Sequence, residues 1–520
     1  MFYITFLLLR NRVCRMLRSI PLAVSSLPDL AEQMSLFSFV LFACLSASAL
    51  ASPGQIPIVD GVIGGVPNTT TATISKVKIA AGNATTAVGQ LRVTENSGVC
   101  ETTKGVYSAS GYGDIAENES IWFWYFAARN NPDTAPLALW FNGGPGSSSM
   151  IGLFQELGPC RITNDSSSVV LNPYSWNTNA NLLFIDQPVG VGFSHGILNV
   201  GTSQEAADDV WTFLQIFFSD SRFSNLLDRD LAIWTESYGG HYGPTFAAYF
   251  LSQNAAIAAG TISGLTLNLK VLGVGDGLTD PLSQYPGYIS YAASNPYHAL
   301  VSSSTLARGN SSWSSSNGCK AQITACNNGG SNSVCSRAQS FCNNNILSPL
   351  AGNYDVYFIL SLNPDAYPPD FTDYINSVAS KIGAESTWSM SNDDVYSNFA
   401  ATGDWMRNSR PDLETVINAG VRTVVYVGDA DYILNFNGVE AMVGALDTKF
   451  SDILKEEELQ NYTVNGQAAG LHKNAGTFSF VRIYGAGHEV PAYTHGALHY
   501  GQAAFQMFSQ IMSDESLSST

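Results

Sequence analysis

The stretch Leu231-Ala232-Ile233-Trp234-Thr235-Glu236-Ser237-Tyr238-Gly239-Gly240 predicts a short buried strand that turns sharply into a helix. The apolar run ends at Ser237, and two glycines open a helix-like stretch at 239–253. A turn of this kind lifts a serine hydroxyl above a parallel sheet, as in a nucleophile elbow. The G-x-S-x-G pattern is only partly met, because Thr235 replaces the first glycine, and a serine beside glycine usually marks no more than a turn. A base, an acid and an oxyanion site must therefore come from elsewhere in the chain.

Six further apolar runs have the length of buried strands: 121–128, 137–141, 181–185, 265–274, 421–427 and 478–484. Helix-like stretches lie between them, including 204–218 and 240–253, and another at 495–511 closes the chain. Alternation of strand and helix predicts an α/β fold with a mostly parallel central sheet flanked by helices on both faces.

The segment 281–400 interrupts this alternation. It is rich in Ser, Asn and Tyr, contains four cysteines, and shows no comparable buried strand. We interpret it as an insertion, a lid folded over the carboxyl edge of the sheet, where α/β enzymes place their sites. A long surface excursion without function is the alternative. We therefore expect residues 96–280 and 401–520 to form the two parts of one core, preceded by a flexible or processed arm at 52–95.

Residues 1–51 have the features of a leader. Met34 starts an apolar run of signal-peptide length, and Ala49-Leu50-Ala51 gives a small-x-small cleavage pattern. The 33 residues before Met34 are either an upstream start wrongly included or an extended basic leader, and we favour Met34 as the true start. Each apolar run is shorter than the roughly 18 residues that a membrane span needs. We expect a secreted protein, with a vacuolar or lysosome-like compartment as second choice.

The net charge of −18 argues against nucleic acid or an anionic membrane as a partner, and it suits an acidic medium. Outside the leader the cysteine number is even. A zinc site is conceivable, but no C-x-x-C pair or nearby histidine supports one, so we expect disulfides and neither metal nor cofactor. Six asparagines head N-x-[ST] triplets and are candidate glycosylation sites: Asn68, Asn83, Asn118, Asn164, Asn310 and Asn461.

Two later strand ends supply partners for Ser237. Gly428-Asp429-Ala430-Asp431 follows the run at 421–427, and Gly485-Ala486-Gly487-His488 follows the run at 478–484. The order serine, aspartate, histidine is that of α/β-hydrolases. Serine needs an imidazole to take its proton and a carboxylate to orient that imidazole. Spacing alone does not separate Asp431 from Asp429.

An oxyanion site is predicted after the strand at 137–141. The loop Asn142-Gly143-Gly144-Pro145-Gly146 allows backbone N–H groups to approach a substrate closely. A generic turn has the same composition.

Several ordered motifs together resemble the serine carboxypeptidase family, and the fungal secreted branch related to carboxypeptidase Y is the nearest. They are 140–149, Glu156-Leu157-Gly158-Pro159, 186–194, 236–240, 277–281 and Gly487-His488. The resemblance runs from about residue 100 to the carboxyl terminus. It implies the α/β-hydrolase fold and a secreted serine-type enzyme that acts at acidic pH on peptide and protein carboxyl ends through an acyl-enzyme.

The resemblance also implies roles for single residues. Ser237 is then the nucleophile, His488 the base, and Asp431 in G-D-x-D-x-x-x-N the orienting acid, while the N–H groups of Gly144 and Tyr238 bind the oxyanion. The positions that hold the substrate's terminal carboxylate are Trp140, Asn142, Gly143, Glu156 and Glu236. A Glu156/Glu236 pair that shares a proton can donate to a carboxylate, because two adjacent carboxyl groups do not both ionise. Otherwise Glu236 merely caps the following helix.

Disulfide pairing follows from the same resemblance. It implies two nested bridges in the insertion, Cys319–Cys342 and Cys326–Cys335, and leaves Cys100 to pair with Cys160.

The chain departs from the family pattern at several positions. Ser147 and Leu434 stand where relatives often have cysteine. Glu489 replaces a methionine and is expected to favour basic or polar leaving residues, and Asp276 replaces an asparagine and is expected to favour a basic residue on the acyl side.

The leading hypothesis is a carboxypeptidase. Two alternatives are an acyltransferase on the same scaffold and a catalytically silent secreted binding glycoprotein. A general lipase or esterase would give no reason for the Glu156/Glu236 pair.

Overall fold

The computed structural model describes residues 58–59, 62–63 and 88–520. The expected leader at 1–51 with Met34, most of the arm at 52–95, and the sequons at Asn68 and Asn83 lie outside the described residues. The chain divides into two units, Met1–Leu50 and Ala51–Thr520, and all described residues belong to the second. Among these residues no helix is long and apolar enough to cross a membrane.

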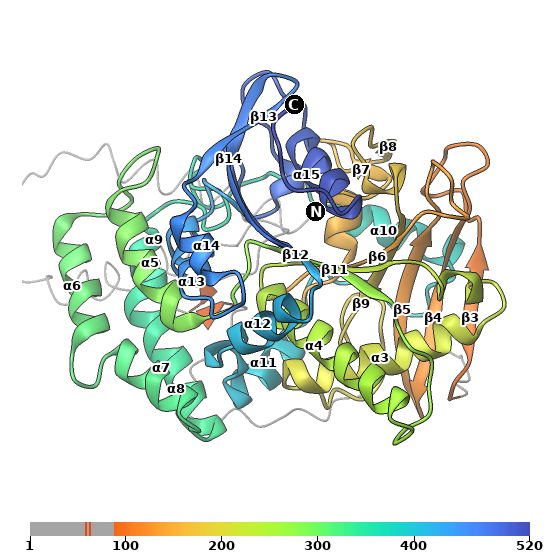
Figure 1. Cartoon of the computed structure of the whole chain (residues 1–520), viewed down its shortest axis with the longest axis horizontal. Helices are drawn as coiled ribbons and strands as arrows, with labels where there is room; N and C mark the ends of the chain where they lie inside the picture. The colour runs from red at the N-terminus through yellow and green to blue at the C-terminus, as the bar shows by residue number, and fades with distance from the viewer. Residues whose placement is uncertain (1–57, 60–61, 64–87) are drawn as a thin grey trace, which may run out of the picture. The chain divides into compact units, whose positions relative to one another are not determined.

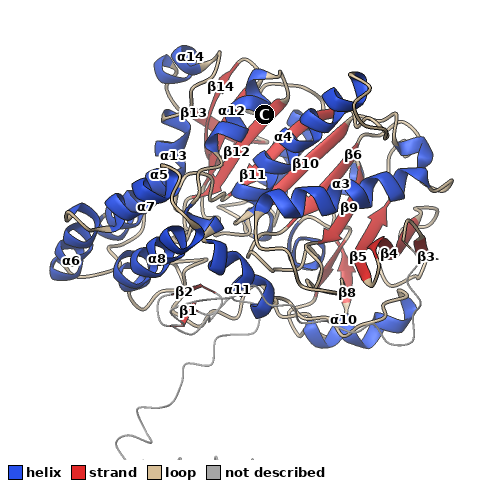
Figure 2. Cartoon of the chain, turned by 90° about the horizontal axis from the view of Figure 1, so that it is seen from below, coloured by secondary structure: helices blue, strands red, loops and turns tan. Residues whose placement is uncertain are grey.

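An eleven-stranded mixed sheet forms the centre of the fold (Figure 2). Its six central strands, from β15 to β9, are parallel, and the strands outside them pair antiparallel. This confirms the predicted α/β-hydrolase architecture with a mostly parallel central sheet. In sheet order the strands are β13 (Gln460–Val464), β14 (Gln467–Ala475), β15 (Phe478–Ile483), β12 (Arg422–Gly428), β11 (Leu269–Gly275), β10 (Leu231–Glu236), β6 (Leu137–Phe141), β9 (Asn181–Asp186), β5 (Glu119–Phe126), β4 (Ser108–Ala116) and β3 (Leu91–Glu95).

Alternating side chains divide the apolar core between the two faces of the sheet. In β5, Phe123 belongs to one apolar cluster, and its neighbours Trp122 and Trp124 belong to the other. Helices α3 (Ser203–Ser219) and α4 (Gly239–Ala258) pack on the first face, where Figure 2 shows them crossing the strands. Helix α15 (Gln502–Met512) covers the second face and places Phe508 against Trp234. The central strands β6, β9, β10 and β12 are buried on both faces, as their continuous apolar runs predict.

The insertion between β11 and β12 is helical and forms the lobe that carries α6, α7 and α8 in Figure 1. Two nested disulfides, Cys319–Cys342 and Cys326–Cys335, join α7 to α8, and the third is Cys100–Cys160, so all three expected bridges are present. The helical elements from β11 to β12 are α5 (Pro281–Ala293), α6 (Ser303–Ser314), α7 (Cys319–Asn327), α8 (Asn332–Cys342), η4 (Asn343–Leu347), α9 (Ser348–Ala351), α10 (Thr372–Val378), η5 (Ala379–Lys381), α11 (Asp393–Thr402), η6 (Asp404–Met406) and α12 (Arg410–Asn418).

The insertion touches the loops at the carboxyl ends of the strands. The backbone N–H of His488 donates to the carbonyl of Tyr357 at 2.9 Å, and that of Ser148 donates to Met390 at 2.9 Å. The remaining short elements are β1 (Ile58–Val59), β2 (Val62–Ile63), η1 (Gly152–Glu156), β7 (Cys160–Ile162), β8 (Val169–Leu171), η2 (Trp176–Thr178), η3 (Ser224–Leu226), α13 (Phe436–Gly444), α14 (Ser451–Glu456) and η7 (Val490–Ala492).

Four expected boundaries are wrong. Helix α4 ends at Ala258 rather than at 253. Strand β11 starts at Leu269 rather than at 265, because the side-chain amides of Gln215 and Asn254 bind the backbone of Leu265 and Leu267 in place of a neighbouring strand. The last helix starts at 502 rather than at 495, because Gly496 and Gly501 interrupt it with φ of +59° and +72°. Residues 91–95, assigned to the arm, form the edge strand β3.

Candidate active site

Ser237 lies at a strained turn between β10 and α4. Its φ of +66° is in the left-handed region that a non-glycine residue rarely adopts, as a nucleophile elbow requires. Its N–H donates to the carbonyl of Gly275 at 3.0 Å, and its carbonyl accepts from the N–H of Leu278 at 3.0 Å. The turn is therefore tied on both sides to the end of β11.

Thr235, the departure from the elbow pattern, is accommodated by the glycines that follow. A Cβ on Gly239 would lie 2.5 Å from the Cβ of Thr235, so the threonine side chain occupies space that Gly239 leaves open. The Thr235 hydroxyl donates to the carbonyl of Gly239 at 2.9 Å. The missing first glycine thus leaves the turn intact.

Asp431 and His488 form a hydrogen-bonded pair beside this turn. Nδ1 of His488 lies 2.9 Å from Oδ2 of Asp431, and both side chains are buried. Asp429 faces elsewhere, since its Oδ1 accepts from Tyr297 and from the N–H of Gly485. The structure thus separates the two aspartates that spacing left equivalent, and the partner of His488 is Asp431.

One cavity brings seven of the expected residues together, whereas Trp140, Glu156, Tyr238 and Asp431 do not line it. Ser237 and His488 both line it and follow strands β10 and β15, which do not neighbour each other in the sheet. Burial lowers the pKa of His488, but the charge and hydrogen bond of Asp431 together with the charges of Glu489 and Glu156 raise it by more, so the net pKa is above the ordinary histidine value. The residues around the cavity are Asn142, Gly143, Gly144, Ser147, Ile151, Glu236, Ser237, Tyr357, His488 and Glu489.

The glycine loop after β6 packs directly on the elbow. A Cβ at Gly143 would lie 2.3 Å from the backbone nitrogen of Tyr238 and 2.7 Å from the carbonyl oxygen of Glu236. Gly144 has φ +108° and lines the cavity. The ring of Tyr238 is buried, and its hydroxyl donates to Asp404 at 2.5 Å. These contacts place the loop that carries Gly144 against the elbow that carries Tyr238, the two residues expected to donate to the oxyanion.

Glu156 and Glu236 meet over the amide of Asn142. The Asn142 Nδ2 group donates to Oε1 of Glu236 at 3.0 Å and to Oε1 of Glu156 at 3.3 Å, and the Trp140 indole donates to Oδ1 of the same asparagine at 2.7 Å. Among the described residues, Oε2 of each glutamate receives no hydrogen bond. Burial raises the pKa of Glu156, and burial together with the charge of Glu156 raises that of Glu236 well above its usual range. The pair therefore retains a proton. Glu236 ends β10 and caps no helix, because Tyr238 is the N-cap residue of α4.

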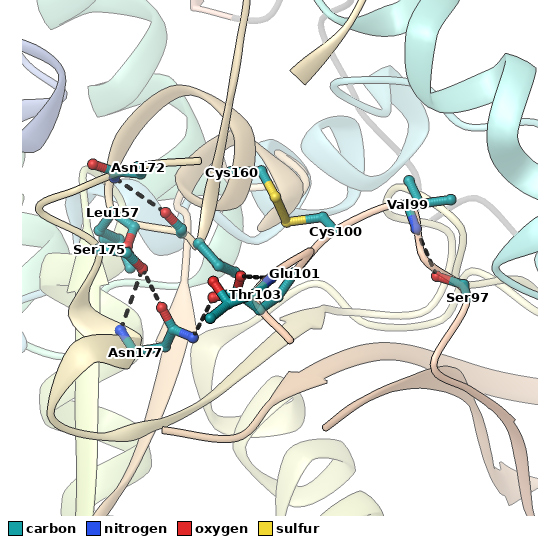
Figure 3. The surroundings of a disulfide bond; sticks show 12 residues. Ser97, Val99, Cys100, Glu101, Thr103, Leu157, Cys160, Asn172, Ser175 and Asn177 are labelled. Carbon is teal, nitrogen blue, oxygen red and sulfur yellow. Dashed lines mark hydrogen bonds between the residues drawn. A yellow bond between two sulfur atoms is a disulfide. The ribbon is translucent and has the colours of Figure 1, made fainter. Parts of the chain in front are cut away.

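A disulfide and its polar surroundings position the segment that carries Glu156 (Figure 3). Cys160, four residues after Glu156, is bonded to Cys100. The Asn172 amide donates to the carbonyls of Glu156 and Gly158, each at 3.1 Å. These contacts fix the backbone from Glu156 to Cys160.

The two specificity candidates have different environments. Glu489 lines the cavity, and burial raises its pKa to about 8. Asp276 does not line the cavity. It is fully buried beside Asp431, with Oδ1 accepting from the N–H of Gly428 at 2.9 Å, so a substrate side chain does not reach it. The structure therefore speaks against an acyl-side pocket role for Asp276.

Three residues line the cavity without having been expected there: Ser147, Ile151 and Tyr357. Tyr357 belongs to the insertion, and its ring lies 5.0 Å from that of His488. Ile151 and Tyr357 lie outside the motifs identified in the sequence.

Comparisons with known proteins agree with this geometry. The profile described as "Serine carboxypeptidase" matches residues 100–514. Carboxypeptidase S1 from Penicillium janthinellum is 43% identical over 431 residues, which cover 82% of this chain and 100% of that protein. Carboxypeptidase Y from Schizosaccharomyces pombe is 37% identical over 74% of this chain and 39% of its own length.

A solved structure shares the fold. The crystal structure of Kex1(delta)p, a prohormone-processing carboxypeptidase from Saccharomyces cerevisiae, matches with a TM-score of 0.63 and 23% identity, and covers 80% of this chain and 93% of that one. The fold, the arrangement at the elbow and the family match over most of the chain give one conclusion. The chain belongs to the serine carboxypeptidase family and is a serine-type carboxypeptidase.

Proposed function

We propose that this carboxypeptidase releases single residues from peptide carboxyl ends through an acyl-enzyme on Ser237. The observation that carries the proposal is a single cavity lined by the nucleophile, the His488 base and the proton-sharing residue Glu236. A hydrolase without selectivity for chain ends has no use for a buried pair of acids beside its serine.

The chemistry follows from the positions of the side chains. His488 accepts the proton of the Ser237 hydroxyl as its oxygen attacks the last peptide carbonyl, and Asp431 stabilises the imidazolium that forms. The N–H groups of Gly144 and Tyr238 stabilise the oxyanion. His488 then gives its proton to the leaving amine, and a water molecule activated in the same way hydrolyses the ester.

The Glu156/Glu236 pair selects the chain end. A peptide's terminal carboxylate is an acceptor, and a proton shared by two glutamates is a donor aimed at it. Asn142, held by Trp140, and Gly143 complete the site. An internal peptide segment has no carboxylate for these groups to bind.

Acidic working conditions are part of the proposal. The shared proton of the glutamate pair is retained at low pH and lost as the pH rises, so affinity for the terminal carboxylate falls toward alkaline pH. The raised pKa of His488 acts in the opposite direction, because the imidazole must be unprotonated to accept the serine proton. The two limits predict a bell-shaped pH profile whose upper edge is set by substrate binding.

Export is supported by three disulfides, which form in oxidising compartments. Of the described sequons, Asn164, Asn310 and Asn461 are exposed and Asn118 is half-buried, so the first three are accessible for glycosylation. We propose a secreted protein, with a vacuolar location as second choice.

The test is digestion of a peptide library at acidic pH, followed by mass spectrometry. Stepwise loss from the carboxyl end is expected, and Ser237→Ala should abolish both this loss and labelling by an organophosphate. Internal cleavage would contradict the exopeptidase role. Transfer of the acyl group to a dilute alcohol or amine in preference to water would indicate an acyltransferase, and an unlabelled Ser237 would indicate a binding protein.

A further inference from the structure

Asp276 is a buried carboxyl group at the site to which the proposed reaction assigns no role. It follows β11 with φ +40°, a left-handed conformation that Asp and Asn tolerate better than most residues. Its N–H donates to the carbonyl of Tyr426 at 2.8 Å, and its side chain has 0% exposure. The carboxyl group is therefore held rigidly between the ends of β11 and β12.

One oxygen of this carboxyl group has a donor and the other has none. Oδ1 accepts from the N–H of Gly428 at 2.9 Å. Within the described part of the chain, Oδ2 receives no hydrogen bond. A buried carboxylate oxygen without a donor is costly, whereas the O–H of a carboxylic acid requires an acceptor.

Asp431 is that acceptor. Carboxyl oxygens of Asp276 and Asp431 and a ring nitrogen of His488 all lie within 4.8 Å of one another. Asp431 already accepts from His488 at 2.9 Å through Oδ2, and its Oδ1 accepts a long bond of 3.3 Å from the N–H of Leu434. Two ionised carboxylates at this separation repel each other, but an acid next to a carboxylate forms a strong hydrogen bond.

We propose that Asp276 keeps its proton and donates a hydrogen bond to Asp431, which fixes the carboxylate that orients His488. The inference rests on the roles proposed above for Asp431 and His488. Asp276 does not contact substrate and is a positioning residue. Asparagine is its neutral isostere, since the amide oxygen can accept from Gly428 and the amide N–H can donate to Asp431.

The surroundings of Asp276 favour its neutral form. Burial and the charge of Asp431 raise its pKa well above the ordinary range, and the bond from Gly428 offsets only part of this. An ionised Asp276 would also hold the proton of His488 more tightly, so that the imidazole would be protonated, and unable to accept the serine proton, up to a higher pH. The titratable groups that face Asp276 come from several elements and are Asp431, His488, Glu489, Glu236 at the end of β10, Tyr426 of β12 and Tyr291 of α5.

A divalent cation between the same three groups is the alternative. Such an ion would occupy the lone pair of a His488 ring nitrogen, and coordination through Nδ1 would replace the hydrogen bond to Asp431. A shared proton leaves this bond in place.

The first test compares the pH dependence of kcat/KM for wild type, Asp276→Asn and Asp276→Gly, since glycine tolerates the positive φ. Removal of the donor in Asp276→Gly is expected to lower kcat about 10- to 100-fold, and Asp276→Asn is expected to recover most of that loss. The lower limb of the profile, set by His488, should stay within about 0.3 pH unit of wild type in Asp276→Asn.

The proposal is overturned if the acidic limb of the kcat/KM profile moves down by more than about one pH unit in Asp276→Asn. Such a shift would mean that the substitution removed a negative charge, so that Asp276 was ionised in wild type. Loss of activity on treatment with EDTA, restored by a divalent cation, would also overturn it.

The second test does not depend on activity. The infrared difference spectrum of wild type minus Asp276→Asn at about pH 6 should contain the carbonyl band of a protonated carboxyl group. Absence of this band overturns the inference. Absence of peptide hydrolysis by wild type, with the band present, would instead count against the proposed function alone.

Discussion

The substitution Glu236→Gln separates recognition of the chain end from the chemical step. In wild type, the Glu156/Glu236 pair loses its shared proton as the pH rises, and the doubly ionised pair repels a terminal carboxylate. The glutamine amide donates at every pH, and together with an ionised Glu156 it has the same net charge as the singly protonated pair. We therefore expect KM for a peptide with a free carboxyl end to rise with pH in wild type and to stay flat in the variant.

The structure also sets the size of the effect. The proton of the pair makes one charge-assisted hydrogen bond to the substrate, worth about 1.5–3 kcal/mol, or about 10- to 100-fold in affinity. The neutral amide of the glutamine provides only part of this binding free energy. The variant should therefore bind about tenfold more weakly than wild type near pH 5 and more tightly near pH 8, so that the two KM curves cross.

The assay is steady-state hydrolysis of a blocked dipeptide from about pH 4 to pH 8, repeated with its carboxyl-terminal amide. The amide has no carboxylate, so the substitution should not change the pH dependence of its KM. Glu440→Gln in α13, whose partner is Arg482 at 3.2 Å, is a matched control away from the cavity. Parallel KM curves for wild type and Glu236→Gln would refute the reasoning.

Three other substitutions test separate features. Asp209→Asn in α3 should raise the free energy of unfolding near pH 8 by about 1 kcal/mol or more and have little effect near pH 4. The reason is that burial raises the folded-state pKa of Asp209 to about 7, so that its ionisation destabilises the fold as the pH rises. Chemical denaturation at both pH values measures this change. Gly143→Ala should lower kcat at least about 100-fold by displacing the elbow, whereas Gly444→Ala, which meets open space, should not; active-site titration and circular dichroism distinguish lost chemistry from lost fold. In wild type, the preference for basic over apolar leaving residues should rise between about pH 5 and pH 8, because Glu489 ionises with a pKa of about 8. Glu489→Met should abolish this rise, and a competitive digestion of both peptide types measures it.

Sequence predicted the centre of the sheet better than its edges. The central strands are buried on both faces and therefore have continuous apolar runs, and β10 begins where its run begins. Strands β3, β4, β13 and β14 were missed, because they lie toward the sheet's two sides and contain glycine or several polar residues. Their positions depend on pairing with a neighbour, which no local pattern contains.

The site divides in a similar way. Motifs at strand ends identified Ser237 and His488, because such motifs fix local backbone geometry. The choice of Asp431 over Asp429 required either the family pattern or the observed hydrogen bond to His488. Tyr357 could not be predicted, since it comes from the insertion and reaches the cavity only through tertiary packing.

The insertion lies between two strands that are neighbours in the sheet, so insertions of different length are compatible with the same sheet. Strands β11 and β12 are parallel neighbours, so the chain must cross over between them in any case. The two ends of the insertion, before α5 and before α12, are held together because the N–H of Ser409 donates to the carbonyl of Thr279 at 2.9 Å, and the entropy of closing a connection rises only slowly with its length. Lids of very different size can therefore be grafted here without changing the register of the sheet. The acceptor that Tyr357 supplies to His488 is the contact that a transplanted lid would have to reproduce.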